Sequence, residues 1–132
     1  MLGPTYRFTA YNATGQALAA NAITIKPRRW KYGTDGSLMD ETVGTADVLG
    51  QTGTMANATY QAGVTQDNTV NKYIGGVFEI TATAPASSDG DITVYLEQSA
   101  DGGATWPDNG LGLWVSTFSF TDAGTKRDVV DL

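Results

Sequence analysis

The stretch that decides the fold is Ser99-Ala100-Asp101-Gly102-Gly103-Ala104-Thr105-Trp106, which lies between two segments with the alternation of β-strands. In such a run the serine and aspartate side chains can bind backbone N–H groups, and the two glycines permit positive φ. The tryptophan can fold back as an apolar lid. The stretch therefore predicts a tight chain reversal in a β-rich fold. It contains no nucleophile–base pair and no complete set of metal ligands.

Strand-like alternation continues on both sides of this turn. Residues 91–98 place Ile92, Val94 and Leu96 on one face of a strand. Other segments that predict strands are residues 5–11, 22–26, 28–32, 73–84, 111–120 and 126–132. Pro27 has no N–H to donate to a ladder, so its strand is expected to stop there, to bulge or to lie at a sheet edge.

These strands, joined by turns and with no amphipathic helix, predict an all-β fold. We expect an antiparallel β-sandwich of jelly-roll or immunoglobulin-like order, with residues 1–132 forming a single domain. Residues 33–71 have only scattered apolar side chains, so an arm or a long loop insertion is expected there. Within that segment, residues 37–49 could contain a short helical turn and residues 55–64 a weak strand.

Composition narrows the classes of function. The chain has no cysteine and no histidine, which excludes a disulfide scaffold and removes the commonest general base and zinc ligand. A net charge of −6 is unfavourable for a nucleic-acid-binding protein. The first five residues lack the pattern of an export signal, and no apolar stretch approaches the roughly 18 residues of a membrane span. We therefore expect synthesis in the cytoplasm and no contact with nucleic acid or membrane.

Residues 26–32 hold four of the eight basic residues around two aromatic ones. Trp30 and Tyr32 could stack on nucleic-acid bases, but the acidic remainder of the chain opposes this. Two other interpretations fit better. The charges could protect a sheet edge from pairing, or Arg28, Arg29, Trp30 and Tyr32 could anchor a docking strip for an acidic protein surface.

Acidic side chains occur at Asp40-Glu41, at Asp89 and Asp91, and at Asp101. A calcium loop needs more oxygen ligands at close spacing than these offer, and no carboxylate pair is singled out for glycoside hydrolysis. We therefore interpret the acids as turn-forming and solvated. We predict no metal, no cofactor, no catalytic residue and no enzymatic activity.

The predicted strand at residues 111–120 is apolar on both faces. One face carries Leu111, Leu113 and Val115, and the other carries Trp114, Phe118 and Phe120. Such a strand is either central in the core or buries its second face against a partner. In a homo-oligomer, for example a trimer, Trp114, Phe118 and Phe120 would form the buried side, which makes them interface candidates.

The 99–106 stretch resembles the Asp box, a short hairpin motif that is repeated in sialidase-type propellers and occurs singly in other β-proteins. In those families the box is mainly a structural hairpin remote from the active site. A propeller would need several copies, and one is present. We therefore interpret the motif as a folding element rather than a sugar or ion site. Its residues are Ser99, Asp101, Gly102, Gly103, Thr105 and Trp106.

A second resemblance covers residues 68–132, about half of the chain. In order, it is carried by Asp67-Asn68-Thr69, Val94-Tyr95-Leu96-Glu97-Gln98-Ser99, Asp101-Gly102-Gly103 and Phe118-Ser119-Phe120. This half resembles small structural proteins of tailed-bacteriophage virions, in which a Tyr-Leu-x-x-Ser strand leads into an Asp-Gly turn.

The virion resemblance implies a non-enzymatic particle protein, with a capsid decoration or cement protein as the favoured role. The implied partners are the major capsid protein, other virion subunits and further copies of the chain. One alternative is a neck, tail or fibre-associated component. Another is a carbohydrate-binding β-sandwich module, in which Trp30, Tyr32, Trp106 or Trp114 would stack on sugar rings.

Overall fold

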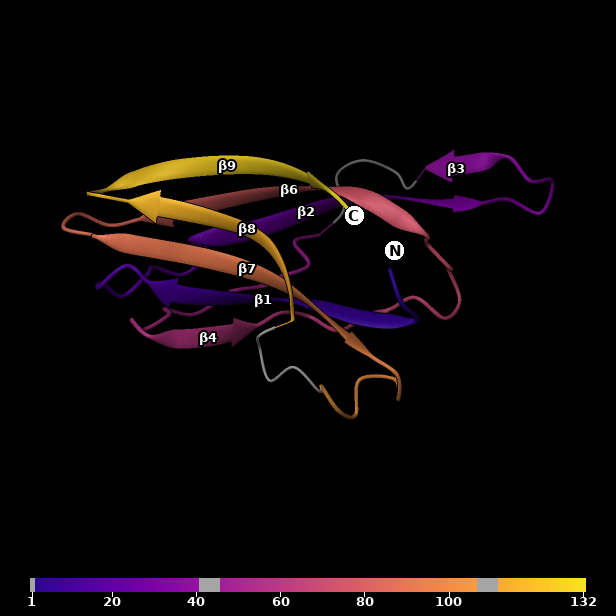
Figure 1. Cartoon of the computed structure of the whole chain (residues 1–132), viewed down its shortest axis with the longest axis horizontal. Coiled ribbons are helices and arrows are strands. Elements are labelled where there is room, and N and C mark those ends of the chain that lie inside the picture. Colours follow the sequence, from indigo (N-terminus) through magenta and orange to yellow (C-terminus); the bar gives the residue numbers. More distant parts are fainter. Residues whose placement is uncertain (1, 41–45, 107–111) are drawn as a thin grey trace.

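The computed structural model describes residues 2–40, 46–106 and 112–132, and its regular secondary structure is entirely β (Figure 1). The strands are β1 (Thr5–Ala13), β2 (Ile23–Tyr32), β3 (Leu38–Asp40), β4 (Thr59–Ala62), β5 (Gln66–Asp67), β6 (Gly75–Ala84), β7 (Gly90–Ser99), β8 (Leu113–Phe120) and β9 (Gly124–Asp131). The expected all-β class is confirmed. The predicted strands are found with ends that differ by at most a few residues.

The strands form two antiparallel sheets that pack face to face (Figure 1). The β1 sheet has the order β4-β1-β7-β8, with β5 also paired to β1. The β6 sheet has the order β3-β2-β6-β9. The connections β1–β2, β6–β7 and β8–β9 each cross from one sheet to the other. The predicted antiparallel β-sandwich is therefore confirmed.

The pairing of the crossing strands decides between the two expected strand orders. Among the four strands β1, β2, β6 and β7, the first in chain order pairs with the last, β7, and the two middle ones, β2 and β6, pair with each other. In the immunoglobulin order the corresponding strands B, C, E and F pair as B with E and C with F. The nested order found here fits the rolled arrangement of a jelly roll.

The core lies between the two sheets. Phe8 of β1 and Phe78 of β6 meet across it, with ring centroids 5.0 Å apart. Around them lie the buried side chains that alternate inward along the long strands: Ala10, Ile23, Ile25, Ile80, Ile92, Val94, Phe118 and Phe120. For β1, β2, β6 and β7 this alternation is the pattern seen in the sequence, so burial of their residues follows directly from the period of a strand.

Pro27 lies inside β2, where that strand forms the edge of its sheet. The N–H groups of Ile23 and Ile25 point away from β6, because they donate to the side chains of Gln51 and Asp47. Backbone N–H groups alternate in direction along a strand, so the nitrogen of Pro27 also points away from β6. The ladder between β2 and β6 therefore does not need the N–H that proline lacks. Of the three alternatives expected for this proline, the sheet edge is the one observed.

The described part of residues 33–71 is only partly an arm. Its first part forms a hairpin with β2, while residues 46–67 pack along the sandwich and supply β4 and β5. Val48, Leu49 and Met55 are buried, and the N–H of Val48 donates to the carbonyl of Ile25 at 2.9 Å. The segment therefore closes the side of the sandwich between β2 and β1.

Two expectations within that segment have different outcomes. The weak strand expected at 55–64 is found as β4, but the helical turn expected in 37–49 is wrong at residues 38–40, which form β3. Glu41 and residues 42–45 lie outside the described residues, as do residues 107–110 and Leu111.

Candidate binding surfaces

The β2–β3 hairpin extends beyond the rest of the sandwich (Figure 1). Its strands pair Trp30 with Asp40 and Tyr32 with Leu38. The turn between them is closed by the N–H of Gly33, which donates to the carbonyl of Ser37 at 2.8 Å. The hairpin is thus held by strand pairing and a closed turn.

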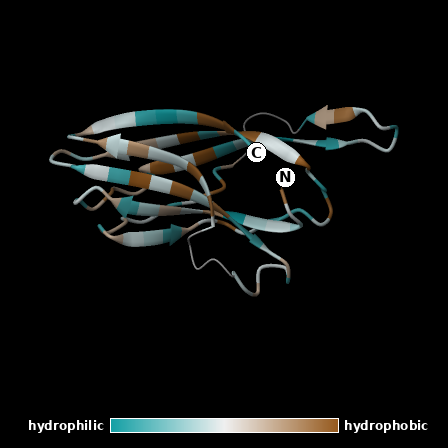
Figure 2. Cartoon of the chain, in the orientation of Figure 1, coloured by the Kyte–Doolittle hydropathy of each residue, from teal (hydrophilic) through white to brown (hydrophobic). Residues whose placement is uncertain are grey.

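The outer face of the hairpin displays apolar side chains. Tyr32 is 64% exposed and its partner Leu38 is 61% exposed, and β3 shows hydrophobic colours in Figure 2. Arg28 and Asp40 lie on the same face and form an exposed ion pair of 2.8 Å. Trp30 is half-buried. Three of the four residues predicted for a docking strip, Arg28, Trp30 and Tyr32, are therefore brought together on one face.

Arg29, the fourth residue, lies on the opposite face of β2 and joins the two sheets. Its Nη1 donates to the hydroxyl of Tyr6 at 2.8 Å and to Oε1 of Gln66 at 3.2 Å. Its guanidinium also lies 4.8 Å from the centre of the Tyr73 ring. These contacts tie Arg29 to its own chain. The sequence alternation contained this signal, since residues 28 and 29 of a strand point to opposite faces.

The 99–106 turn has the structure that its sequence predicts. Gly102 and Gly103 have φ of 75° and 92°. Ser99 Oγ donates to Asp101 Oδ1 at 2.6 Å and accepts from the N–H of Gly103 at 2.9 Å. Asp101 also accepts bonds from the hydroxyl of Thr105 at 2.6 Å and from its N–H at 2.9 Å. These bonds hold the Asp101 pKa well below its ordinary range, with the Ser99 hydroxyl as the largest cause. The geometry supports the interpretation of a folding element.

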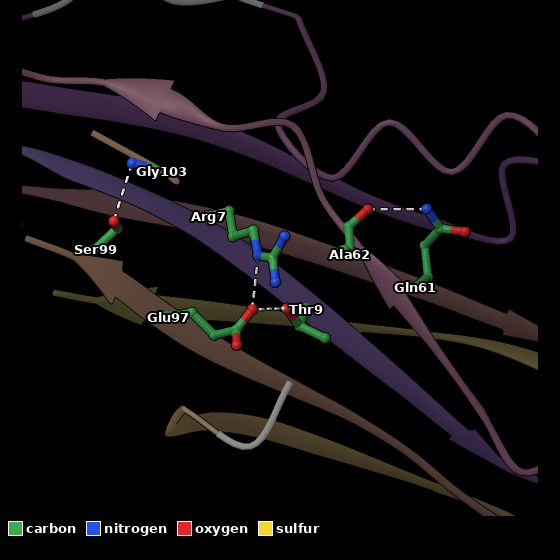
Figure 3. Close-up of polar contacts among 7 residues, drawn as sticks. All are labelled: Arg7, Thr9, Gln61, Ala62, Glu97, Ser99 and Gly103. Carbon is green, nitrogen blue, oxygen red and sulfur yellow. Dashed lines mark hydrogen bonds and ion pairs between the residues drawn. The ribbon is translucent and has the colours of Figure 1, made fainter. Parts of the chain in front are cut away.

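Trp106 folds back from this turn onto β1, as the lid expectation requires. The guanidinium of Arg7 lies 4.1 Å from the centre of the Trp106 ring. Arg7 in turn bonds the carboxylate of Glu97 through Nε at 2.7 Å, and Thr9 donates its hydroxyl to the same oxygen at 2.6 Å (Figure 3). Glu97 is completely buried. No local pattern predicts this cluster, because its residues come from strands about 90 positions apart.

The interface prediction for β8 is wrong for two of its three residues. Phe118 and Phe120 are buried in the core with exposures of 4% and 3%, so they offer no surface to a partner. Trp114 is 61% exposed on the outer face of the β1 sheet. Trp114 points outward because of a β-bulge at Val115: Val94 pairs with Ser116 while Tyr95 pairs with Trp114, which leaves Val115 without a partner in the ladder. The bulge changes which residues point outward.

No group of three or more potential metal-ligating side chains is found among the described residues. A hollow of about 410 Å³ beside the chain start is lined by Leu2, Pro4, Asn68, Lys72 and Tyr73, among others. Within the same described ranges, no helix is long and apolar enough to span a membrane.

Comparisons with protein-family models, curated proteins and solved structures found no match for this chain.

Proposed function

We propose that this chain is a non-enzymatic structural protein of a tailed-bacteriophage virion, where it acts as a capsid decoration protein. The virion assignment is supported by the sequence resemblance of residues 68–132. The docking role is supported by one observation, the projecting β2–β3 hairpin with its exposed Tyr32–Leu38 pair. The expected partner is a shell subunit.

The outer face of the hairpin has the composition of a protein interface. Tyr, Trp and Arg are the residues that most often dominate binding energy, and Tyr32, Trp30 and Arg28 share this face. The exposed Arg28–Asp40 pair lies beside them and suits a polar rim. Asp35 accepts the N–H and hydroxyl of Ser37 at 3.0 and 2.7 Å. Such a held turn lowers the ordering cost of docking.

The decisive experiment for the virion role is the copy number in purified virions of the phage that encodes the chain. Quantitative mass spectrometry would compare its amount with that of the major capsid protein. A stoichiometry comparable to the capsid protein supports decoration. A few copies per particle would support the neck, tail or fibre alternative instead, and absence from virions would refute the proposal.

A second experiment tests the hairpin. The purified protein is mixed with expanded shells that lack it, and bound protein is measured by co-sedimentation. The double variant Tyr32→Ser/Leu38→Ser should weaken binding by about tenfold or more, as expected for loss of central interface residues. Trp114→Ser is the matched control, because Trp114 is equally exposed on the other sheet. Unchanged binding by the double variant would rule out docking through this hairpin.

A further inference from the structure

Four aromatic side chains form a row across the outer face of the β1 sheet, one on each of its four main strands. Tyr60 of β4 pairs with Tyr11 of β1, and Tyr95 of β7 pairs with Trp114 of β8. Tyr11 and Tyr95 are diagonal neighbours in the β1–β7 ladder, in which Tyr11 lies opposite Thr93. With strands about 4.8 Å apart, the row spans roughly 14 Å.

The two outer rings of this row, Tyr60 and Trp114, are exposed, and the two inner rings, Tyr11 and Tyr95, are half-buried. Tyr11 and Tyr60 have ring centroids 4.5 Å apart with planes tilted by 35°. Tyr60 is 46% exposed and Trp114 is 61% exposed. The indole N–H of Trp114 donates to the hydroxyl of Thr117 at 2.9 Å. The β8 bulge makes this bond possible, because it places residues 114 and 117 on the same face.

Hydroxyl groups accompany the rings. The pKa of Tyr60 is raised, first by partial desolvation and then by the phenol groups of Tyr95 and Tyr11. Thr93 and Thr117 lie next to the row, and their hydroxyl oxygens are 3.4 Å apart. Phenol and threonine hydroxyls both donate and accept hydrogen bonds. The face thus combines apolar rings with neutral polar groups.

We propose that the row of Tyr60, Tyr11, Tyr95 and Trp114 is a binding platform for a neutral polysaccharide. A pyranose has an apolar face of C–H bonds, which packs on an aromatic ring, and a rim of hydroxyls, which needs neutral donors and acceptors. The row supplies both and carries no charge of its own. The residues differ from those predicted for sugar stacking, apart from Trp114.

Other occupants fit this face less well. Nucleic acids and other polyanions are disfavoured by the chain's net charge of −6. A proline-rich peptide docks in an aromatic-lined groove, where an indole N–H commonly binds one of its carbonyl groups. The row is instead spread over an open sheet, and the indole N–H of Trp114 is already bonded to Thr117.

The test is affinity electrophoresis in native gels that contain a soluble mixed-linkage β-glucan, a galactomannan or a dextran. We expect at least one of these neutral polysaccharides to retard the protein relative to a gel without polymer. Trp114→Ala and Tyr60→Ala should each weaken binding by about tenfold or more. Tyr60→Phe, which keeps the ring and removes the hydroxyl, should weaken it less. Circular dichroism would check that each variant is folded.

Tyr32→Ala is the matched control, because it removes an equally exposed aromatic ring from the hairpin and should bind polysaccharide as the unmodified chain does. The proposal is overturned if none of the three polysaccharides retards the protein, or if Trp114→Ala and Tyr60→Ala bind normally. It is also overturned if sedimentation velocity shows a dimer that Trp114→Ala dissociates, since the row would then join two copies. The result is independent of capsid docking, which depends on Tyr32 and Leu38.

Discussion

The β2–β3 hairpin and the 99–106 turn are both closed by an aspartate followed by glycine, yet one extends into solvent and the other folds back on its own sheet. Asp35 binds the N–H and hydroxyl of Ser37, and Asp101 binds the same two groups of Thr105. The local chemistry is therefore alike. What differs is the residue that follows: Trp106 lies over Arg7 of β1, and this contact returns the second turn to the sheet.

The ion pairs of the two regions show the same contrast. Arg28 and Asp40 on the hairpin lie 2.8 Å apart, with side chains 56% and 48% exposed. Arg7 and Glu97 near the 99–106 turn lie 2.7 Å apart, with exposures of 19% and 0%. The distances are nearly equal, so burial alone should separate their effects on stability. The buried Arg7–Glu97 pair should therefore contribute more to the stability of the fold than the exposed Arg28–Asp40 pair of the hairpin.

The largest expected difference is between Glu97→Ala and Asp40→Ala. Removing Glu97 leaves the Arg7 guanidinium without its partner in a mostly buried site, which should lower the free energy of unfolding by about 3 kcal/mol. Removing Asp40 breaks an exposed pair and should cost less than about 1 kcal/mol. Urea denaturation followed by fluorescence would measure both values.

Glu97→Gln is the conservative control for this pair, because it keeps the volume and an acceptor for the Thr9 hydroxyl. It should be destabilised less than Glu97→Ala. Equal losses for Glu97→Ala and Asp40→Ala would contradict the contrast between the two regions.

A smaller difference is expected between the two aromatic side chains. Trp106→Ala removes the ring that stacks on Arg7 and should lower the free energy of unfolding by about 1 kcal/mol. Tyr32→Ala removes a ring that is 64% exposed and should change stability by no more than about 0.5 kcal/mol. Thermal unfolding of both variants under one buffer condition would compare them. A larger loss from Tyr32→Ala would mean that the hairpin contributes to the fold.

Local patterns explain why much of the fold could be predicted. The long strands follow from alternation along the chain, and the 99–106 turn follows from its own serine, aspartate and glycines. The Asp35-Gly36 turn carried a comparable hairpin signal, which the sparse apolar pattern of residues 33–71 obscured. Where the contacts that determine an element are close in sequence, its residues were sufficient to predict its structure.

Contacts between distant residues explain what could not be predicted. The carboxamide of Gln51 accepts a hydrogen bond from the N–H of Ile23, and the carboxylate of Asp47 accepts one from the N–H of Ile25. These bonds hold residues 47–51 against β2, although the sequence of this segment predicts a loop. The bulge at Val115 shifts the alternation of β8, so that residues before and after it point to opposite faces from those that a regular strand would give. The shift is not visible in the sequence, because apolar residues occur at both odd and even positions of this strand. For this reason Phe118 was placed on a surface although it lies in the core.

The smallest expected difference concerns pH and the two turn aspartates. The pKa of Asp101 and that of Asp35 are both held below the ordinary value of 3.8, because each carboxylate accepts hydrogen bonds in the folded chain. A folded-state pKa below the unfolded value means that the stabilisation is fully present above 3.8 and is lost as pH falls below it.

Asp101→Asn should therefore lower the melting temperature at neutral pH, and its difference from the unmodified chain should shrink in acid. Asp35→Asn should behave alike with a smaller difference, since its side-chain bonds come from Ser37 alone, whereas Asp101 is bonded by Ser99 and Thr105. Melting temperatures from neutral pH to below 3.8 would show this, and a difference independent of pH would mean that the charges of these carboxylates do not hold the turns.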